Sequence, residues 1–231
     1  MGIYDKFNKK KVNSSYSSLK SIKDFQEIAN LVVSEQWEQI INIYESGGNI
    51  IQVLNDFLNS KPVNDFLRKK NNISLFTNYP DLISKVAYAL GIIGERNPSA
   101  IEKAIPQLIK LLDYETIEDF EVLANLIVGD AVHALLRIGM VDVSYLKEAT
   151  PKLIKLLQAD DGYICGAAVK ALAEVGSTEA LDAVRPLLND TRIYEVKSGY
   201  NAGGGFVRMI SKESIVTVGQ VVNEVIEKTK K

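Results

Sequence analysis

Apolar residues recur at helical spacing through most of the chain, and one arrangement of them repeats three times between residues 82 and 191. In each copy, a first helical pattern closes on Ala-Leu-x-x-Ile/Val-Gly and a second one closes on Leu-Leu. The first motif occupies residues 89–94, 134–139 and 171–176, and the second occupies residues 111–112, 156–157 and 187–188. Helix pairs repeated at this period bury their apolar faces against neighbouring pairs, so the pattern predicts an all-α solenoid.

Glycine closes the first helical pattern of every copy. The residues are Gly94, Gly139 and Gly176. Because glycine adopts the left-handed conformation at little cost, we expect each of them to end its helix there.

The second helices carry start signals. Ser99 is followed three residues later by Glu102, which predicts a capping box, and Ser144 is expected to cap the equivalent helix of the next copy. Pro106 and Pro151 come seven residues after these serines and interrupt the backbone hydrogen-bond ladder. In these two copies, the second helix is therefore expected to consist of a short lead-in turn followed by a kinked main helix.

Composition and periodicity change outside the three copies. Residues 1–20 are polar and rich in Ser, Lys and Asn, whereas residues 22–44 and 50–58 carry two further amphipathic patterns. The predicted divisions are a flexible basic tail (1–20), a divergent N-terminal helical cap (21–81), three repeats (82–191), and a hairpin with a C-terminal capping helix (192–231).

Two segments interrupt the helical rhythm. Alternating apolar and polar residues at 192–198 and 206–210 flank a Gly/Asn-rich centre, which predicts a small β-hairpin near residues 192–210. Residues 113–126 form an insertion at the same point of an earlier repeat and are a second candidate for a hairpin. Loops that recur at one position project from one edge of a solenoid, where binding surfaces are commonly built.

The repeated motifs resemble the HEAT repeat, and specifically its phycobilisome-lyase-like (PBS lyase) subgroup, an armadillo-like helical class. That subgroup reads Ala-Val-x-Ala-Leu-x-x-Ile-Gly followed by Ala-x-Pro-x-Leu-Ile-x-Leu-Leu, and the matching residues here are 131–139, 149–157 and 168–176. The resemblance covers about residues 82–190. It implies a right-handed, curved α-solenoid that binds proteins, and it implies no single reaction.

One departure from the family pattern is clear. HEAT units usually carry an Arg entering the first helix, paired in a ladder with a preceding Asp. The aligned positions here are Ile83, Val128 and Cys165. The resemblance therefore predicts divergent repeats without that ladder.

Composition excludes several classes of protein. The 231 residues have a net charge of −2, so no global electrostatic attraction to nucleic acid exists. The single cysteine excludes an internal disulfide and agrees with a reducing compartment, and no uninterrupted apolar stretch predicts a membrane span. We expect a cytoplasmic protein.

No catalytic, cofactor-binding or metal-binding constellation is found in the sequence. His133 is the only histidine and occupies an outward position of its repeat, so we interpret it as a plain surface residue. Cys165 occupies an apolar repeat position, which predicts a small buried side chain rather than a nucleophile.

Candidate binding residues lie on the polar backs of the second helices and in the insertion at 113–126. On the helices, a mildly basic ridge is predicted to line the concave face: Lys103, Gln107, Lys110, Lys152, Lys155 and Arg185. The insertion adds an acidic set suited to a basic partner: Glu115, Glu118, Asp119 and Glu121.

These observations favour a non-enzymatic scaffold or adaptor that binds a protein partner through its concave face and edge loops. Two alternatives follow from the resemblance. One is a PBS-lyase-like enzyme or enzyme subunit, and the other is a HEAT-like DNA-binding or DNA-repair protein, against which the overall charge argues.

Overall fold

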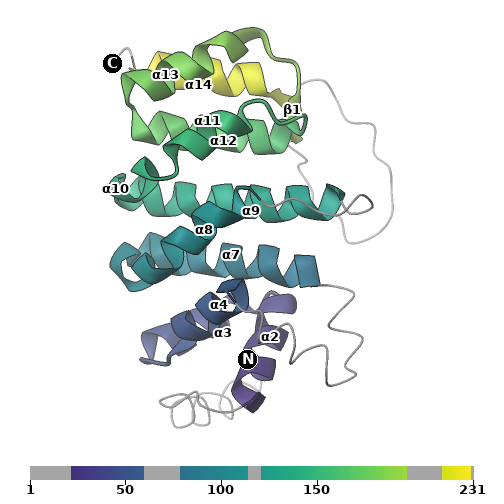
Figure 1. Ribbon diagram of the computed structural model, residues 1–231, viewed down its shortest axis with the longest axis vertical. Coiled ribbons are helices and arrows are strands. Elements are labelled where there is room, and N and C mark those ends of the chain that lie inside the picture. Colours follow the sequence, from purple (N-terminus) through teal and green to yellow (C-terminus); the bar gives the residue numbers. More distant parts are fainter. Residues whose placement is uncertain (1–21, 60–78, 114–120, 197–214, 230–231) are drawn as a thin grey trace, which may run out of the picture.

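The computed structural model describes residues 22–59, 79–113, 121–196 and 215–229, and in them helices stack along one axis from α2 to α14 (Figure 1). The predicted all-α solenoid with a small β element is confirmed. The elements in chain order are α2 (Ile22–Val33), α3 (Trp37–Glu45), α4 (Ile50–Asn59), α7 (Tyr79–Arg96), the 3₁₀ helix η1 (Pro98–Ala104), α8 (Ile105–Leu111), α9 (Glu121–Val141), α10 (Ser144–Lys147), α11 (Thr150–Leu156), α12 (Gly162–Val175), α13 (Thr178–Val184), the 3₁₀ helix η2 (Arg185–Asn189), β1 (Ile193–Val196), β2 (Ile215–Thr217) and α14 (Val218–Thr229).

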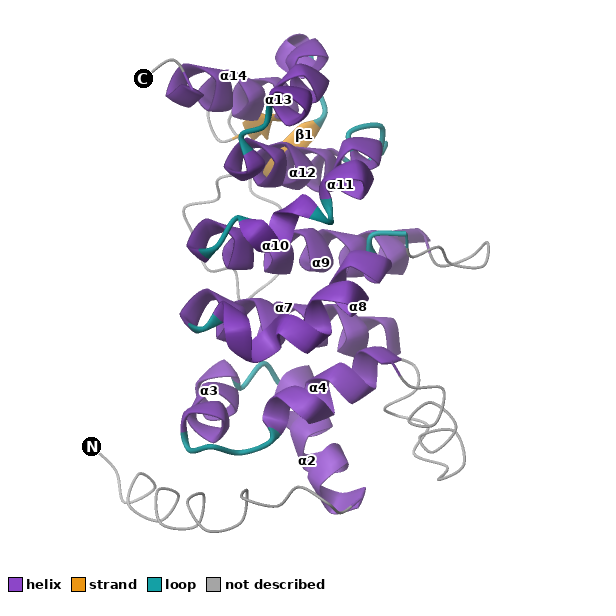
Figure 2. Cartoon of the chain, turned by 60° about the vertical axis from the view of Figure 1, so that its left-hand side comes forward, coloured by secondary structure: helices purple, strands orange, loops and turns teal. Residues whose placement is uncertain are grey.

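Three helix pairs form the repeats. Their first helices are α7, α9 and α12, and the matching second helices lie in a separate column that Figures 1 and 2 show from two sides. The predicted lead-in turns are confirmed in the first two repeats, where η1 precedes α8 and α10 precedes α11. Pro106 and Pro151 are the second residues of the main helices, where a missing N–H costs nothing.

The closing glycines do not share one role. Gly176 follows α12 with a φ of 63°, as predicted. For Gly94 and Gly139 the prediction is wrong, because both lie inside their helices. A Cβ atom on Gly94 would come within 2.6 Å of Ile138 Cγ1, and one on Gly139 would overlap the side chain of Leu146. These two glycines permit close packing of helices instead of ending them.

The predicted serine caps are also corrected. The Ser99 hydroxyl donates to Asn97 Oδ1 at 2.7 Å and caps no backbone N–H. At the start of α10, the backbone N–H of Ser144 donates to Asp142 Oδ1 at 2.9 Å, so the aspartate supplies the capping oxygen. A carboxylate reaches a neighbouring amide two residues ahead as readily as a serine hydroxyl does.

The N-terminal cap contains a break that its sequence pattern hides. The single helix expected over 22–44 is two helices, α2 and α3, and Glu35 between them has a φ of 55°. Lys85 of α7 donates to the last carbonyl of α2, on Val33, at 3.0 Å and pairs with Glu35 at 3.1 Å. A contact from the first repeat thus holds the break in place.

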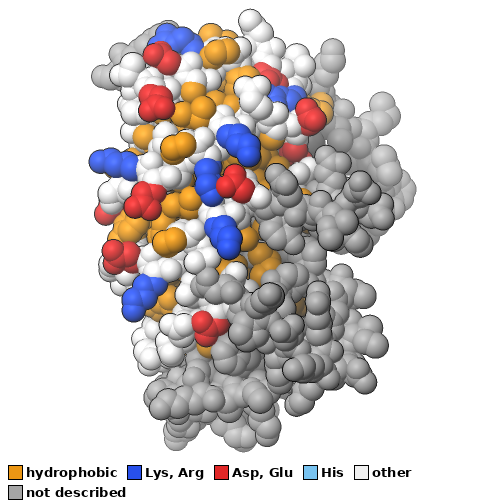
Figure 3. All heavy atoms as spheres, in the orientation of Figure 1, with side chains coloured by type: hydrophobic (Ala, Val, Ile, Leu, Met, Phe, Trp, Pro, Cys, Tyr) orange, Lys and Arg blue, Asp and Glu red, His pale blue; other side chains and the backbone are white. Residues whose placement is uncertain are grey.

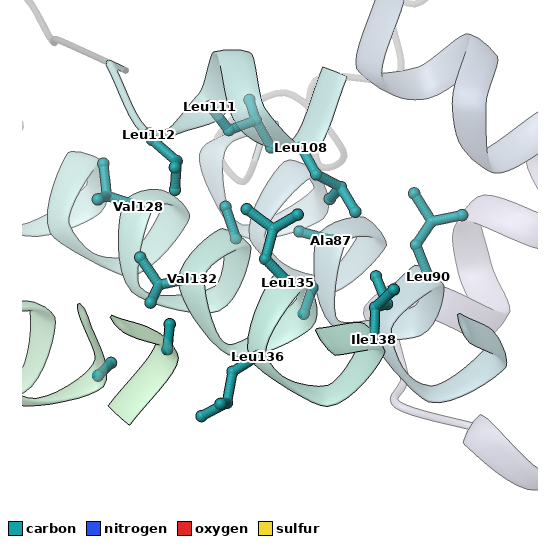
Figure 4. Packing of buried hydrophobic residues seen from close by; sticks show 14 of the residues in the cluster. Ala87, Leu90, Leu108, Leu111, Leu112, Val128, Val132, Leu135, Leu136 and Ile138 are labelled. Carbon is teal, nitrogen blue, oxygen red and sulfur yellow. The ribbon is translucent and has the colours of Figure 1, made fainter. Parts of the chain in front are cut away.

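Buried aliphatic side chains run continuously along the stack. Figure 4 shows Leu135 of α9 at the centre of one part, with Ala87 of α7 and Leu108 of α8 beside it. Within α9, the window Ala124–Val141 is long and apolar enough to cross a membrane by length and composition alone. Because 61% of that window is buried inside the protein, packing between α7 and α12 accounts for its apolar character.

Of the predicted hairpin near residues 192–210, the structure describes the first strand, β1, which pairs with a segment outside the predicted range. β1 pairs antiparallel with β2, with Ile193 opposite Thr217 and Val196 opposite Ile215. The expected partner segment, 206–210, lies outside the described residues. The hairpin considered within 113–126 is wrong for residues 121–126, which belong to α9, and residues 114–120 also lie outside the described part.

Candidate functional site

The predicted basic ridge lies on the face formed by the second helices. Lys103 belongs to η1, while α8 and α11 carry Gln107, Lys110, Lys152 and Lys155. In Figure 1, α8 lies in front of α7 and α11 in front of α12, and Figure 3 shows the same face with Lys and Arg side chains gathered around an acidic one near its middle. The ridge therefore contains a local cluster rather than evenly spaced charges.

The cluster forms around one carboxylate at the junction of two repeats. Asp113 follows the end of α8, and its Oδ2 accepts from Lys152 Nζ of α11 at 2.6 Å, while its Oδ1 lies 3.8 Å from Lys155 Nζ. Lys110 lies one helical turn before Asp113, whose backbone N–H donates to the Lys110 carbonyl at 3.2 Å. We call Lys110, Lys152 and Lys155 the lysine cluster.

Two ammonium groups of the lysine cluster, those of Lys152 and Lys155, thus lie within ion-pair distance of the Asp113 carboxylate. The hydrogen bond from Lys152, with the positive charges of Lys152 and Lys155, holds the pKa of Asp113 below its ordinary value. Lys110 has no described carboxylate within ion-pair distance. The cluster therefore retains positive charge that an acidic ligand can neutralise.

Lys152 differs from Lys110 and Lys155 in the contacts of its ammonium group. Its ammonium group also donates to the Ile109 carbonyl in the last turn of α8, at 3.1 Å. A cation is favourable at that end of a helix, because the carbonyls there carry partial negative charge. Lys152 therefore links the two repeats, whereas Lys155, with 73% of its side chain exposed, remains free to reorient.

The remaining predicted residues are not brought into the cluster. Arg185 pairs with Asp182 at 3.5 Å, one turn away on the surface of the third repeat. Of the acidic set, Glu115, Glu118 and Asp119 lie outside the described residues. Glu121 is the first residue of α9, and its side chain also lies outside the described part.

The first helices α9 and α12, together with β1, carry an aromatic arrangement that the sequence did not predict. The Tyr163 ring lies 5.0 Å from His133 and stacks nearly parallel to Tyr194 at 6.1 Å, and Lys170 Nζ lies 4.4 Å above Tyr194. Two glycines are the signal in the sequence. Gly129 lies four residues before His133, and Gly166 lies four residues before Lys170. A Cβ at Gly129 would come within 2.7 Å of the Tyr163 ring.

His133 is therefore a half-buried residue and not the plain surface residue that we expected. Its Nε2 atom is buried without a hydrogen-bond partner. Burial, with the positive charges of Lys170 and Arg137, lowers its pKa to about 4. The correction arises because the neighbouring repeat covers the outward position with Tyr163.

This environment predicts a stability change with pH. His133 has a pKa near 6.5 when unfolded and about 4 when folded, so the unfolded chain binds the proton more readily between these values. The contribution of neutral His133 to the free energy of unfolding is complete above pH 6.5 and is lost as the pH falls towards 4. After screening by solvent it amounts to about 1–2 kcal/mol. Urea unfolding of the wild type and of His133→Phe measures it. Because no other histidine exists, the variant should show no change between pH 6.5 and 5, and an equal slope in both proteins would contradict the assignment.

Within the described residues nothing forms a catalytic or metal-binding group. Cys165 is buried, its thiol donates to the Leu157 carbonyl at 3.4 Å, and burial raises its pKa to about 11. The prediction of a small buried side chain is confirmed, because Cys165 is fully buried. No group of three His, Cys, Asp or Glu residues in the described segments is placed to hold a metal ion.

Comparison with protein families agrees with the observed architecture. The family model for HEAT repeats matches residues 129–200, which cover the second and third helix pairs. The family model for the PBS lyase HEAT-like repeat matches residues 84–114, which cover the first pair. No curated protein matches the chain.

Proposed function

Because the chain is a HEAT-repeat protein, a scaffold of stacked helix pairs, we propose that it is a non-enzymatic adaptor that binds an acidic segment of a protein partner. The binding surface in this proposal is the second-helix face around the lysine cluster. The observation that carries the proposal is the pairing of Lys152 and Lys155 of one repeat with Asp113 of the preceding repeat, where the exposed Lys110 lies one helical turn before Asp113.

The kind of partner follows from the shape and charge of this face. The lysines lie on neighbouring helices of a continuous column, so an extended chain segment crossing the junction reaches both repeats at once. Complementary charge of this kind chiefly gives orientation and rapid association. A carboxylate-bearing peptide is the ligand that matches it.

Nucleic acid fits this face less well. Its cations are interspersed with exposed acidic residues, among them Glu102, Glu148 and Asp182, and the whole chain carries a net charge of −2. Phosphate-driven binding requires several unopposed cations along a path and weakens steeply with salt. A DNA-binding role would be supported by a salt-dependent shift of duplex DNA at micromolar protein.

The enzyme alternative rests on the PBS lyase HEAT-like match at residues 84–114. That match covers one helix pair, and residues 84–114 include no histidine and no cysteine. Retention of a tetrapyrrole on co-expression would favour this alternative.

Charge reversal tests the proposed surface. The double variant Lys110→Glu/Lys155→Glu should lose the proteins that co-purify with the wild type, because both ammonium groups are exposed and hold no structural contact comparable to that of Lys152. The measurement is quantitative mass spectrometry of complexes isolated from native lysate, with recovery expected to fall at least about tenfold.

The matched control is Lys147→Glu/Lys228→Glu, which makes the same change in net charge on α10 and α14. The control should retain the wild-type partners. Equal recovery with both double variants would refute binding at the lysine cluster.

A further inference from the structure

Asp113 occupies an unfavourable position for the stability of its own helix. It directly follows the C-terminal residues of α8, where the aligned peptide dipoles leave partial negative charge and a second negative charge is repelled. The carboxylate is nevertheless directed to Lys152 and Lys155 of the next repeat. Its side-chain contacts therefore lie with Lys152 and Lys155 of the next repeat and not with the helix that precedes it.

We propose that the Asp113 carboxylate occupies the lysine cluster in the free protein, at the position that a carboxylate of the partner takes on binding. The partner's carboxylate then displaces that of Asp113. This inference rests on the proposed function and names both the ligand group, an Asp or Glu side chain, and the group that competes with it. Asp113 thereby lowers the affinity of the lysine cluster for acidic segments, because a segment must displace the Asp113 carboxylate in order to bind.

The contacts of Asp113 are weak enough to be exchanged. Its side chain is 43% exposed, and that of Lys155 is 73% exposed at a separation of 3.8 Å. Ion pairs in such surroundings contribute little, because water screens the charges and two long side chains lose freedom. A segment that supplies several carboxylates can therefore replace the single one of Asp113.

The lysine cluster keeps one fixed ammonium group when the Asp113 carboxylate is displaced. Lys152 remains held by the Ile109 carbonyl, so one ammonium group stays in position. Lys155 is then available to the incoming carboxylates, and Lys110 is exposed one helical turn before Asp113. A preorganised cation lowers the entropy that the ligand must lose.

The test uses an eight-residue oligoglutamate peptide carrying a fluorophore, titrated with the full-length protein at low salt and followed by anisotropy. Asp113→Asn and Asp113→Ala should tighten binding about three- to fivefold, the range expected for loss of one exposed competing ion pair. Raising the salt concentration should weaken binding in all proteins.

Asp182→Asn is the matched control, because Asp182 is an exposed acid of the second-helix face that pairs with Arg185 and not with the cluster. It makes the same change in net charge, so it reports any general electrostatic effect. Equal tightening with Asp182→Asn would overturn the inference, and so would unchanged or weaker binding with both Asp113 variants. In either case, peptide binding by the wild type would leave the proposed function intact. Absence of peptide binding by every protein would overturn both.

Discussion

Replacing Leu135 with alanine is expected to lower the free energy of unfolding by about 2–5 kcal/mol, the range for a leucine deleted from a well-packed core. Leu135 is fully buried on α9, and Figure 4 shows it between side chains of α7 and α8. Removing its isobutyl group leaves a cavity where three helices meet, and the rigid helical stack can collapse into it only in part. Urea unfolding followed by circular dichroism measures the change.

The control for this prediction lies on the same helix. Leu126, 47% exposed, belongs to the described end of α9, and Leu126→Ala should change the free energy of unfolding by less than about 0.5 kcal/mol. Similar losses in the two variants would mean that α9 is not the central layer of the stack.

Replacing Arg192 with alanine is expected to cost about 2–4 kcal/mol, close to the loss when one partner of a partly buried charge pair is removed. The guanidinium group of Arg192 pairs with Asp190, donates to the Leu157 carbonyl at 3.2 Å, and also donates to the carbonyl of Ala159. It thus ties the segment before β1 to the residues that follow α11. The substitution removes the guanidinium donor from the Ala159 carbonyl, from the Leu157 carbonyl, which keeps only the Cys165 thiol, and from Asp190, which keeps only the backbone N–H of residue 192.

Arg185→Ala is the comparison, because Arg185 is 62% exposed and its ion pair with Asp182 is a surface contact. It should cost no more than about 0.5 kcal/mol. Thermal unfolding of both variants at pH 7 distinguishes them, and an undetectable difference between them would contradict the structural role of Arg192.

The helical repeats could be predicted because their signals are local. The apolar spacing of each helix and the prolines at positions 106 and 151 act within a few residues, and the structure places the lead-in turns where those prolines require them. The roles of Gly94 and Gly139 could not be found in the same way. Each glycine is needed because a particular side chain, Ile138 or Leu146, packs against it, and that pairing is a property of the folded stack.

The candidate site was predicted in part for a similar reason. The outward positions of Lys110, Lys152 and Lys155 follow from helical periodicity, but the reach of Asp113 across the repeat junction does not. His133 was misjudged because Tyr163, thirty positions further along the chain, covers it. Contacts between repeats therefore decide both the burial of single residues and the grouping of charges.

The most direct test of the proposed adaptor function is the acetylation rate of each lysine, measured by mass spectrometry with and without the co-purifying partner. Binding at the second-helix face should slow acetylation of Lys110 and Lys155 and leave Lys147 and Lys228 unchanged. Unaltered rates at Lys110 and Lys155, with protection at lysines elsewhere such as Lys170 of the first-helix face, would contradict binding at the lysine cluster.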